Sequence, residues 1–312
     1  MPVDPQVQAL LDEFRRQGVP PFDQMSVTQA RLVAGGFRDL QGEPQDVGEV
    51  RDILVPGPMG RLPVRTYHPA PGKSLPLVVY FHGGGWVIGD IEIADRPCRA
   101  LANASQCVVA SVNYRLSPET KFPGPVDDCY AAMCWLAEHA ADIGAEGRSV
   151  AVSGDSAGGN LAAVMALMAR DRGGPVLSCQ LLIYPVTAPA QGSTFASYQD
   201  NAEGYLLTRG TMMWFWEHYL ASADDGRNPY AAPLHAADLR GLPPAMVITA
   251  EFDPLRDEGL AYAQRLREAG VVVKSSHYQG MIHGFFWMAG AVQRGRDLIA
   301  ELANELREQF AA

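Results

Sequence analysis

Short apolar runs alternate with helical patterns over most of the chain. The runs at 77–81 and 150–152 are continuously apolar and those at 107–112, 179–184 and 245–249 are mostly apolar, which is typical of strands buried on both faces of a sheet. Segments with helical spacing of apolar residues lie between and after them, at 94–104, 126–140, 161–169 and 255–268. This alternation predicts an α/β fold, with a mostly parallel sheet and helices on both faces.

Several stretches depart from this rhythm. Residues 6–40 have helical spacing interrupted at Pro20-Pro21, and 47–55 with 62–67 predict an antiparallel pair of strands. No strand pattern occurs at 187–233, which instead contains an aromatic helix at 208–220; a strand at 271–273 and a helix at 291–310 close the chain. We therefore expect a helical appendage at 1–45, a core built from 46–186 and 234–312, and an inserted helical lobe at 187–233.

A serine stands where one buried strand gives way to a helix. Ser156 lies in the sequence Gly154-Asp155-Ser156-Ala157-Gly158-Gly159, a Gly-x-Ser-x-Gly frame that is typical of a nucleophile on a sharp strand-to-helix turn. Glycine on each side has no Cβ to clash where the helix and the backbone are forced close together. The alternative is a tight turn whose serine only caps the helix.

A serine hydroxyl needs a base to remove its proton and a third group to orient that base. His283, in a glycine-flanked loop after the last strand, is the best-placed base, and His82 is its rival. Asp253 follows the strand at 245–249 and is the expected acid, although it could also cap the next helix; Asp257 competes with it. The order Ser156, Asp253, His283 is that of an α/β-hydrolase triad.

Consecutive glycines follow the strand at 77–81. Gly83, Gly84 and Gly85 could turn backbone N–H groups toward a developing oxyanion, and the N–H of Ala157, next to the serine, could supply a further donor.

Together, His82-Gly83-Gly84-Gly85-Trp86 and Gly154-Asp155-Ser156-Ala157-Gly158-Gly159 resemble motifs of the hormone-sensitive-lipase-like family of bacterial carboxylesterases. The stretches at 114–119, 242–244 and 253–258 are also similar to that family. The resemblance implies an α/β-hydrolase fold in which 1–45 and 187–233 form the helical cap. It also implies a Ser156/Asp253/His283 triad, oxyanion donors among Gly83, Gly84, Gly85 and Ala157, and short to medium acyl esters as substrates.

For the substrate pocket we expect Trp86, Asp155, Trp214 and Phe285. The two-step acyl transfer implied by the triad needs no metal and no cofactor. By resemblance alone, the last strand could form a homodimer. A non-catalytic small-ligand-binding protein on the same fold, or an amidase with the same triad, are the alternatives.

Composition and charge exclude several classes of binding partner. A net charge of −10 and a pI near 5.2 argue against nucleic acid and against an anionic membrane surface. The five cysteines lack CxxC pairing, which predicts reduced thiols rather than a zinc site. No apolar run approaches the ~18 residues of a membrane span, and no secretory signal is visible, so we expect a cytoplasmic, soluble protein acting on a small-molecule ester.

Overall fold

The apolar runs form the middle of one sheet. In the computed structural model, which describes residues 2–311, eight strands lie in the order β1-β2-β4-β3-β5-β6-β7-β8. β1 pairs antiparallel with β2, as predicted, and β2 pairs antiparallel with β4, whereas all other neighbours are parallel. The strands are β1 (Glu49–Gly57), β2 (Gly60–His68), β3 (Leu75–Phe81), β4 (Val108–Val112), β5 (Ala145–Asp155), β6 (Leu177–Ile183), β7 (Ala245–Phe252) and β8 (Val273–Ile282).

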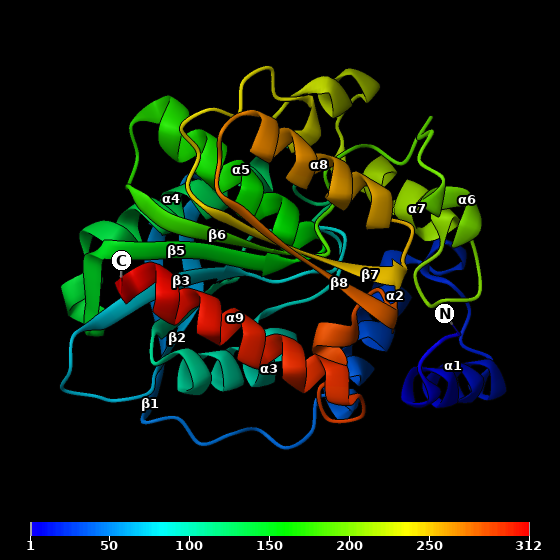
Figure 1. Ribbon diagram of the computed structural model, residues 1–312, viewed down its shortest axis with the longest axis horizontal. Coiled ribbons are helices and arrows are strands. Elements are labelled where there is room, and N and C mark those ends of the chain that lie inside the picture. Colours follow the sequence, from blue (N-terminus) through cyan, green and yellow to red (C-terminus); the bar gives the residue numbers. More distant parts are fainter. Residues whose placement is uncertain (1, 312) are drawn as a thin grey trace.

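Helices cover both faces of this sheet (Figure 1). α3 (Ile91–Ser105) and α9 (Gln293–Ala311) lie on one face, and α4 (Gly124–Glu138), α5 (Ala157–Arg172) and α8 (Arg256–Glu268) lie on the other. α5 is buried continuously from Ala157 to Ala169, as its all-round apolar pattern predicts. The core lies between the sheet and these helices. Full burial of each large apolar side chain there contributes roughly 1.5–3 kcal/mol to the free energy of folding.

The last strand differs from its prediction. The apolar run at 271–273 marks only its beginning, because β8 continues to Ile282 through polar residues, and Val272 is 68% exposed before the strand starts. Among the strands of residues 2–311, β8 pairs with β7 alone and so forms an edge of the sheet, where polar side chains are common. The extension places His283 directly at the carboxyl end of a strand.

The helices from the first residues and from 187–233 lie together beyond the carboxyl ends of the strands (Figure 1). They are α1 (Pro5–Gln17), α2 (Val27–Gly35), α6 (Ser197–Asp200) and α7 (Arg209–Tyr219). One contact between the two segments is the hydrogen bond that the Thr211 hydroxyl donates to Asp23 over 2.7 Å. Two parts of the chain far apart in sequence thus cover the same end of the sheet.

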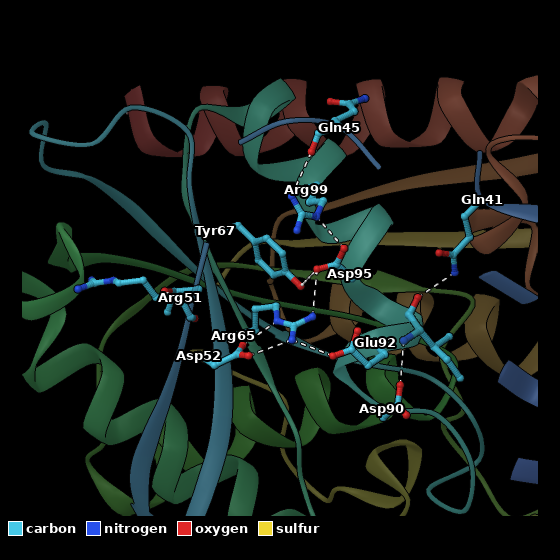
Figure 2. A network of polar contacts seen from close by, with 12 residues as sticks. Gln41, Gln45, Arg51, Asp52, Arg65, Tyr67, Asp90, Glu92, Asp95 and Arg99 are labelled. Atoms are coloured by element: carbon cyan, nitrogen blue, oxygen red, sulfur yellow. Dashed lines mark hydrogen bonds and ion pairs between the residues drawn. The ribbon is translucent and has the colours of Figure 1, made fainter. Parts of the chain in front are cut away.

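A charged network fastens the antiparallel edge of the sheet to helix α3 (Figure 2). Arg65 of β2 is 14% exposed and contacts Asp52 of β1 at 2.7 Å, Glu92 at 2.8 Å and Asp95 at 3.3 Å. Tyr67 donates a hydrogen bond to the same Asp95. The Arg65 guanidinium thus offsets the charge of several carboxylates, and Arg99 adds a second cation beside Asp95 at 2.6 Å.

The strand order brings the loops after β3 and β5 to one point at the carboxyl ends of the strands. β3 lies between β4 and β5, so the chain turns in opposite directions after β3 and after β4, and ligands of open α/β sheets bind at such a reversal, outside the carboxyl ends. The triglycine loop follows β3 and the Ser156 turn follows β5 at this point. Among the described residues, no helix has the length and hydropathy to cross a bilayer.

Candidate active site

Ser156 is held in a strained backbone conformation between β5 and α5. Its φ of 56° and ψ of −118° are unusual for a residue with a side chain. A Cβ on Gly158 would lie 1.9 Å from the Phe81 carbonyl oxygen, and one on Gly154 would lie 2.3 Å from the carbonyl oxygen of Gly158. Close backbone contacts therefore require glycine at both positions of the motif, as predicted for a sharp strand-to-helix turn.

The three residues named from the sequence meet at this turn. His283 Nε2 lies 2.9 Å from Ser156 Oγ, and His283 Nδ1 lies 2.8 Å from Asp253 Oδ2. Asp253 is completely buried, and its Oδ1 accepts the Leu255 N–H at 2.8 Å, so the carboxylate orients the imidazole and also caps the following turn. Hydroxyl, imidazole and carboxylate form a chain that can move a proton from serine to histidine.

The competing residues are engaged elsewhere. His82 stacks on Tyr114 with ring centroids 4.4 Å apart, and its Nδ1 contacts the Gly83 carbonyl oxygen at 2.8 Å. Burial lowers the pKa of His82 to about 4, so its ring is neutral at ordinary pH. Asp257 accepts the Ser197 N–H at 2.8 Å and pairs with Arg256 at 2.7 Å.

The glycine loop offers fewer donors than the sequence suggested. The Gly83 N–H donates to Asp155 Oδ1 at 2.9 Å, so the expectation that Gly83 serves as an oxyanion donor is wrong. Within residues 2–311, no hydrogen bond uses the N–H groups of Gly84, Gly85 or Ala157. Gly84 and Gly85 line the same cavity as Ser156, so these N–H groups are available near the hydroxyl.

Asp155 explains why Gly83 is occupied. Its buried carboxylate also accepts the Tyr80 hydroxyl, and thereby joins β3, the glycine loop and the Ser156 turn. Burial raises the pKa of Asp155 to about 6, against the opposing effect of these hydrogen bonds.

A small apolar cavity of about 70 Å³ opens at Ser156 and His283. A water molecule occupies roughly 30 Å³ of liquid, so this space suits a group of few atoms. Besides Ser156, His283, Gly84 and Gly85, its lining consists of Phe22, Phe37, Ile88, Asp155, Leu206, Leu207, Phe215, Gly284, Trp287 and Met288. Asp155 is thus the one expected pocket residue in this lining.

Trp86, Trp214 and Phe285 do not line the cavity, which corrects the prediction. Trp86 is completely buried against α7. Trp214 lies on α7 one residue, and so about 100° of helix rotation, away from the lining residue Phe215, and it packs on His218. Phe285 points into the core, 4.8 Å from the Tyr278 ring.

The lining residues that sequence reasoning missed come from several separate segments. Phe22 and Phe37 belong to the first 45 residues, and Leu206, Leu207 and Phe215 to the inserted lobe. The run Phe285–Met288 is a 3-10 turn whose last two residues, Trp287 and Met288, face the cavity. The aromatic character of these stretches was a signal for the pocket, but no local pattern selects the residue that faces it.

In the described part of the chain, no group of three or more His, Cys, Asp or Glu side chains is arranged to hold a metal ion.

Comparisons with known proteins agree with this geometry. A family model described as the alpha/beta hydrolase fold matches residues 78–287. The carboxylic ester hydrolase LipN of Mycobacterium tuberculosis is 40% identical over 322 residues, covering 99% of this chain and 84% of LipN.

Solved structures are similar along the whole chain. An esterase from Pyrobaculum calidifontis superposes with a TM-score of 0.94 at 42% identity, covering 100% of both chains. The ester hydrolase EH1AB1 from the Lake Arreo metagenome, solved with a bipyridine phosphonate derivative, has a TM-score of 0.94 at 41% identity and covers 99% of this chain and 100% of its own. The chain belongs to the hormone-sensitive-lipase-like family of the α/β-hydrolase fold.

Proposed function

We propose that the protein is a serine carboxylesterase that hydrolyses short- to medium-chain carboxylic esters. The observation that carries the proposal is the chain of contacts Ser156–His283–Asp253, at 2.9 and 2.8 Å. The small apolar cavity at Ser156 favours an uncharged group of few atoms. The esterases to which the chain is similar support the same reaction class.

The mechanism follows from the geometry. His283 Nε2 takes the proton from Ser156 Oγ as this oxygen attacks the ester carbonyl, and Asp253 stabilises the imidazolium that forms. The N–H groups of Gly84, Gly85 and Ala157 donate to the oxygen of the tetrahedral species. His283 returns the proton to the alcohol, which leaves; water then attacks the acyl-enzyme in the same way, and the carboxylic acid departs.

A wider groove of about 480 Å³ adjoins the cavity and shares Phe22, Phe37 and Leu206 with it. It runs between the N-terminal helices and residues 204–208. We infer that the cavity takes the smaller side of the ester and that the groove accommodates the larger side.

An acyl-length series on chromogenic aryl esters tests the proposal. Wild type should release a burst of alcohol and then turn over, whereas Ser156→Ala should lose about 10⁶-fold of kcat, the order seen when a triad serine is removed. Ser149→Ala, within the strand β5 that precedes the Ser156 turn, controls for loss of a serine. Equal rates in wild type and Ser156→Ala would end the serine mechanism, silence of wild type would favour a ligand-binding protein, and cleavage of the matching anilides would favour an amidase.

The homodimer and the cytoplasmic location remain proposals. Within residues 2–311, no further strand lies beyond β8 in the sheet, and sedimentation velocity would test whether a second copy pairs there. The five free cysteines fit a reducing compartment, and fractionation of cells that make the protein would test the location.

A further inference from the structure

The glycine loop after β3 has an unusual backbone conformation at residues 84–86, which the glycines explain only in part. Gly84, Gly85 and Trp86 all have positive φ, at 111°, 57° and 61°. Glycine adopts such angles freely, but a residue as bulky as tryptophan adopts them only where its surroundings hold it there.

Helix α7 supplies those surroundings. The Trp86 ring stacks on the Tyr219 ring with centroids 4.0 Å apart and an angle of 4° between the planes. Trp216, one turn earlier on α7, contacts the Trp86 ring edge-on, with ring centroids 4.8 Å apart. All three side chains are completely buried, so the stack is well shielded from solvent.

The neighbouring glycine is covered by the same helix. A Cβ on Gly85 would lie 2.1 Å from the Phe215 ring, so the ring rests directly on the Gly85 backbone. The end of α7 is itself fixed to the core, because the Phe122 N–H donates to the Tyr219 carbonyl oxygen at 2.8 Å. Phe215 and Tyr219, one turn apart on α7, thus pack directly against Gly85 and Trp86.

We propose that Tyr219 is a positioning residue for the oxyanion donors. Its ring, stacked on Trp86, holds the left-handed backbone at 84–86 and thereby directs the N–H groups of Gly84 and Gly85 toward the tetrahedral oxygen. The ring acts and not the hydroxyl, which has no hydrogen-bond partner among the described residues. This inference rests on the proposed esterase function.

The test compares Tyr219→Leu, Tyr219→Phe and Trp214→Leu with wild type. Trp214→Leu removes an aromatic ring from the same helix at a half-buried position, where the ring packs on His218 and Phe215 and not on Trp86. The measurements are kcat and KM on a short aryl ester, the pH profile, and the affinities for a trifluoromethyl ketone, which forms an oxyanion on the serine, and for the carboxylate product. Thermal melts verify that each variant is folded at the assay temperature.

For Tyr219→Leu we expect kcat and ketone affinity to fall together by about ten-fold or more, since loss of one oxyanion donor costs 10²–10³ in kcat. KM, product affinity and the shape of the pH profile should stay close to wild type, because the lost interaction exists only in the transition state. Tyr219→Phe should retain wild-type values, as should Trp214→Leu.

Folded Tyr219→Leu with wild-type kcat would overturn the inference, as would a loss of kcat without a loss of ketone affinity. Equal impairment of Tyr219→Phe would assign the effect to the hydroxyl and refute the role of the ring. If Tyr219→Leu does not fold, Tyr219→Met provides the same comparison with more of the buried volume kept. Failure of the wild type to hydrolyse esters would instead refute the proposed function.

Discussion

Replacing Glu258 with glutamine removes a carboxyl group that the fold keeps uncharged. Glu258 lies on α8 and is completely buried, and its Oε1 accepts the N–H groups of Thr187 at 2.6 Å and Ala188 at 3.2 Å, where the chain leaves the core for residues 187–233. Burial raises the pKa of Glu258 to about 8. A glutamine carbonyl can accept the same hydrogen bonds, so the substitution removes the titration and keeps the contacts.

The sign of the effect follows from the raised pKa. Below the ordinary value of 4.5 the carboxyl is protonated in both the folded and the unfolded chain. Between 4.5 and about 8 the unfolded chain releases a proton that the folded protein retains, so the free energy of unfolding decreases as the pH rises. At 1.36 kcal/mol per pH unit, the difference between the two pKa values corresponds to about 5 kcal/mol as an upper limit.

Urea unfolding of wild type and Glu258→Gln at pH 5 and pH 8.5 measures this difference. The advantage of the glutamine variant should increase by several kcal/mol from the lower to the higher pH, and comparison of two otherwise identical chains cancels the other titrating groups. Glu268→Gln, at an exposed position of the same helix, controls for the loss of one negative charge. A stability difference that stays constant between the two pH values would refute a neutral Glu258 in the folded protein.

Two further substitutions test the cavity and the charged network. Phe215→Ala enlarges the cavity at Ser156, so the best acyl length should increase, each additional buried CH₂ being worth about 0.8 kcal/mol, or roughly four-fold in kcat/KM; an acyl-length profile that is only scaled down would contradict this. Arg65→Met removes the cation of Asp52 and Glu92, whereas Asp95 keeps its ion pair with Arg99 at 2.6 Å. Because the Asp52 and Glu92 side chains are more than half exposed, we expect a loss of about 1–2 kcal/mol in urea unfolding with unchanged kcat. Because the hydrogen bond from Arg65 lowers the pKa of Asp52, its stabilisation is present above the unfolded pKa and is lost as the pH falls, so the acid sensitivity attributable to Asp52 should disappear in Arg65→Met (Figure 2). Arg240→Met, which breaks the exposed pair with Asp238, should leave stability unchanged, and an equal effect of both variants would count against the network.

Local patterns were sufficient to predict the order of strands and helices and the placement of three site residues. A continuous apolar run identifies a buried strand, and a residue after such a run must lie at one end of the sheet. Ser156, Asp253 and His283 each follow a strand, and the structure brings them within hydrogen-bond distance. The edge strand β8 was underestimated because a polar edge carries little apolar signal.

The sequence by itself therefore determined the α/β alternation, the strand-to-helix turn at Ser156 and the family motifs, since each depends on residues close together in the chain. Tertiary structure alone decided that Gly83 is occupied by Asp155, that Trp86 packs beneath α7, and that Phe215 rather than Trp214 faces the cavity. Adjacent residues of a helix point about 100° apart, so the rotation of α7 against the core selects the lining residue. That rotation is set by contacts between segments more than a hundred residues apart, which no local pattern contains.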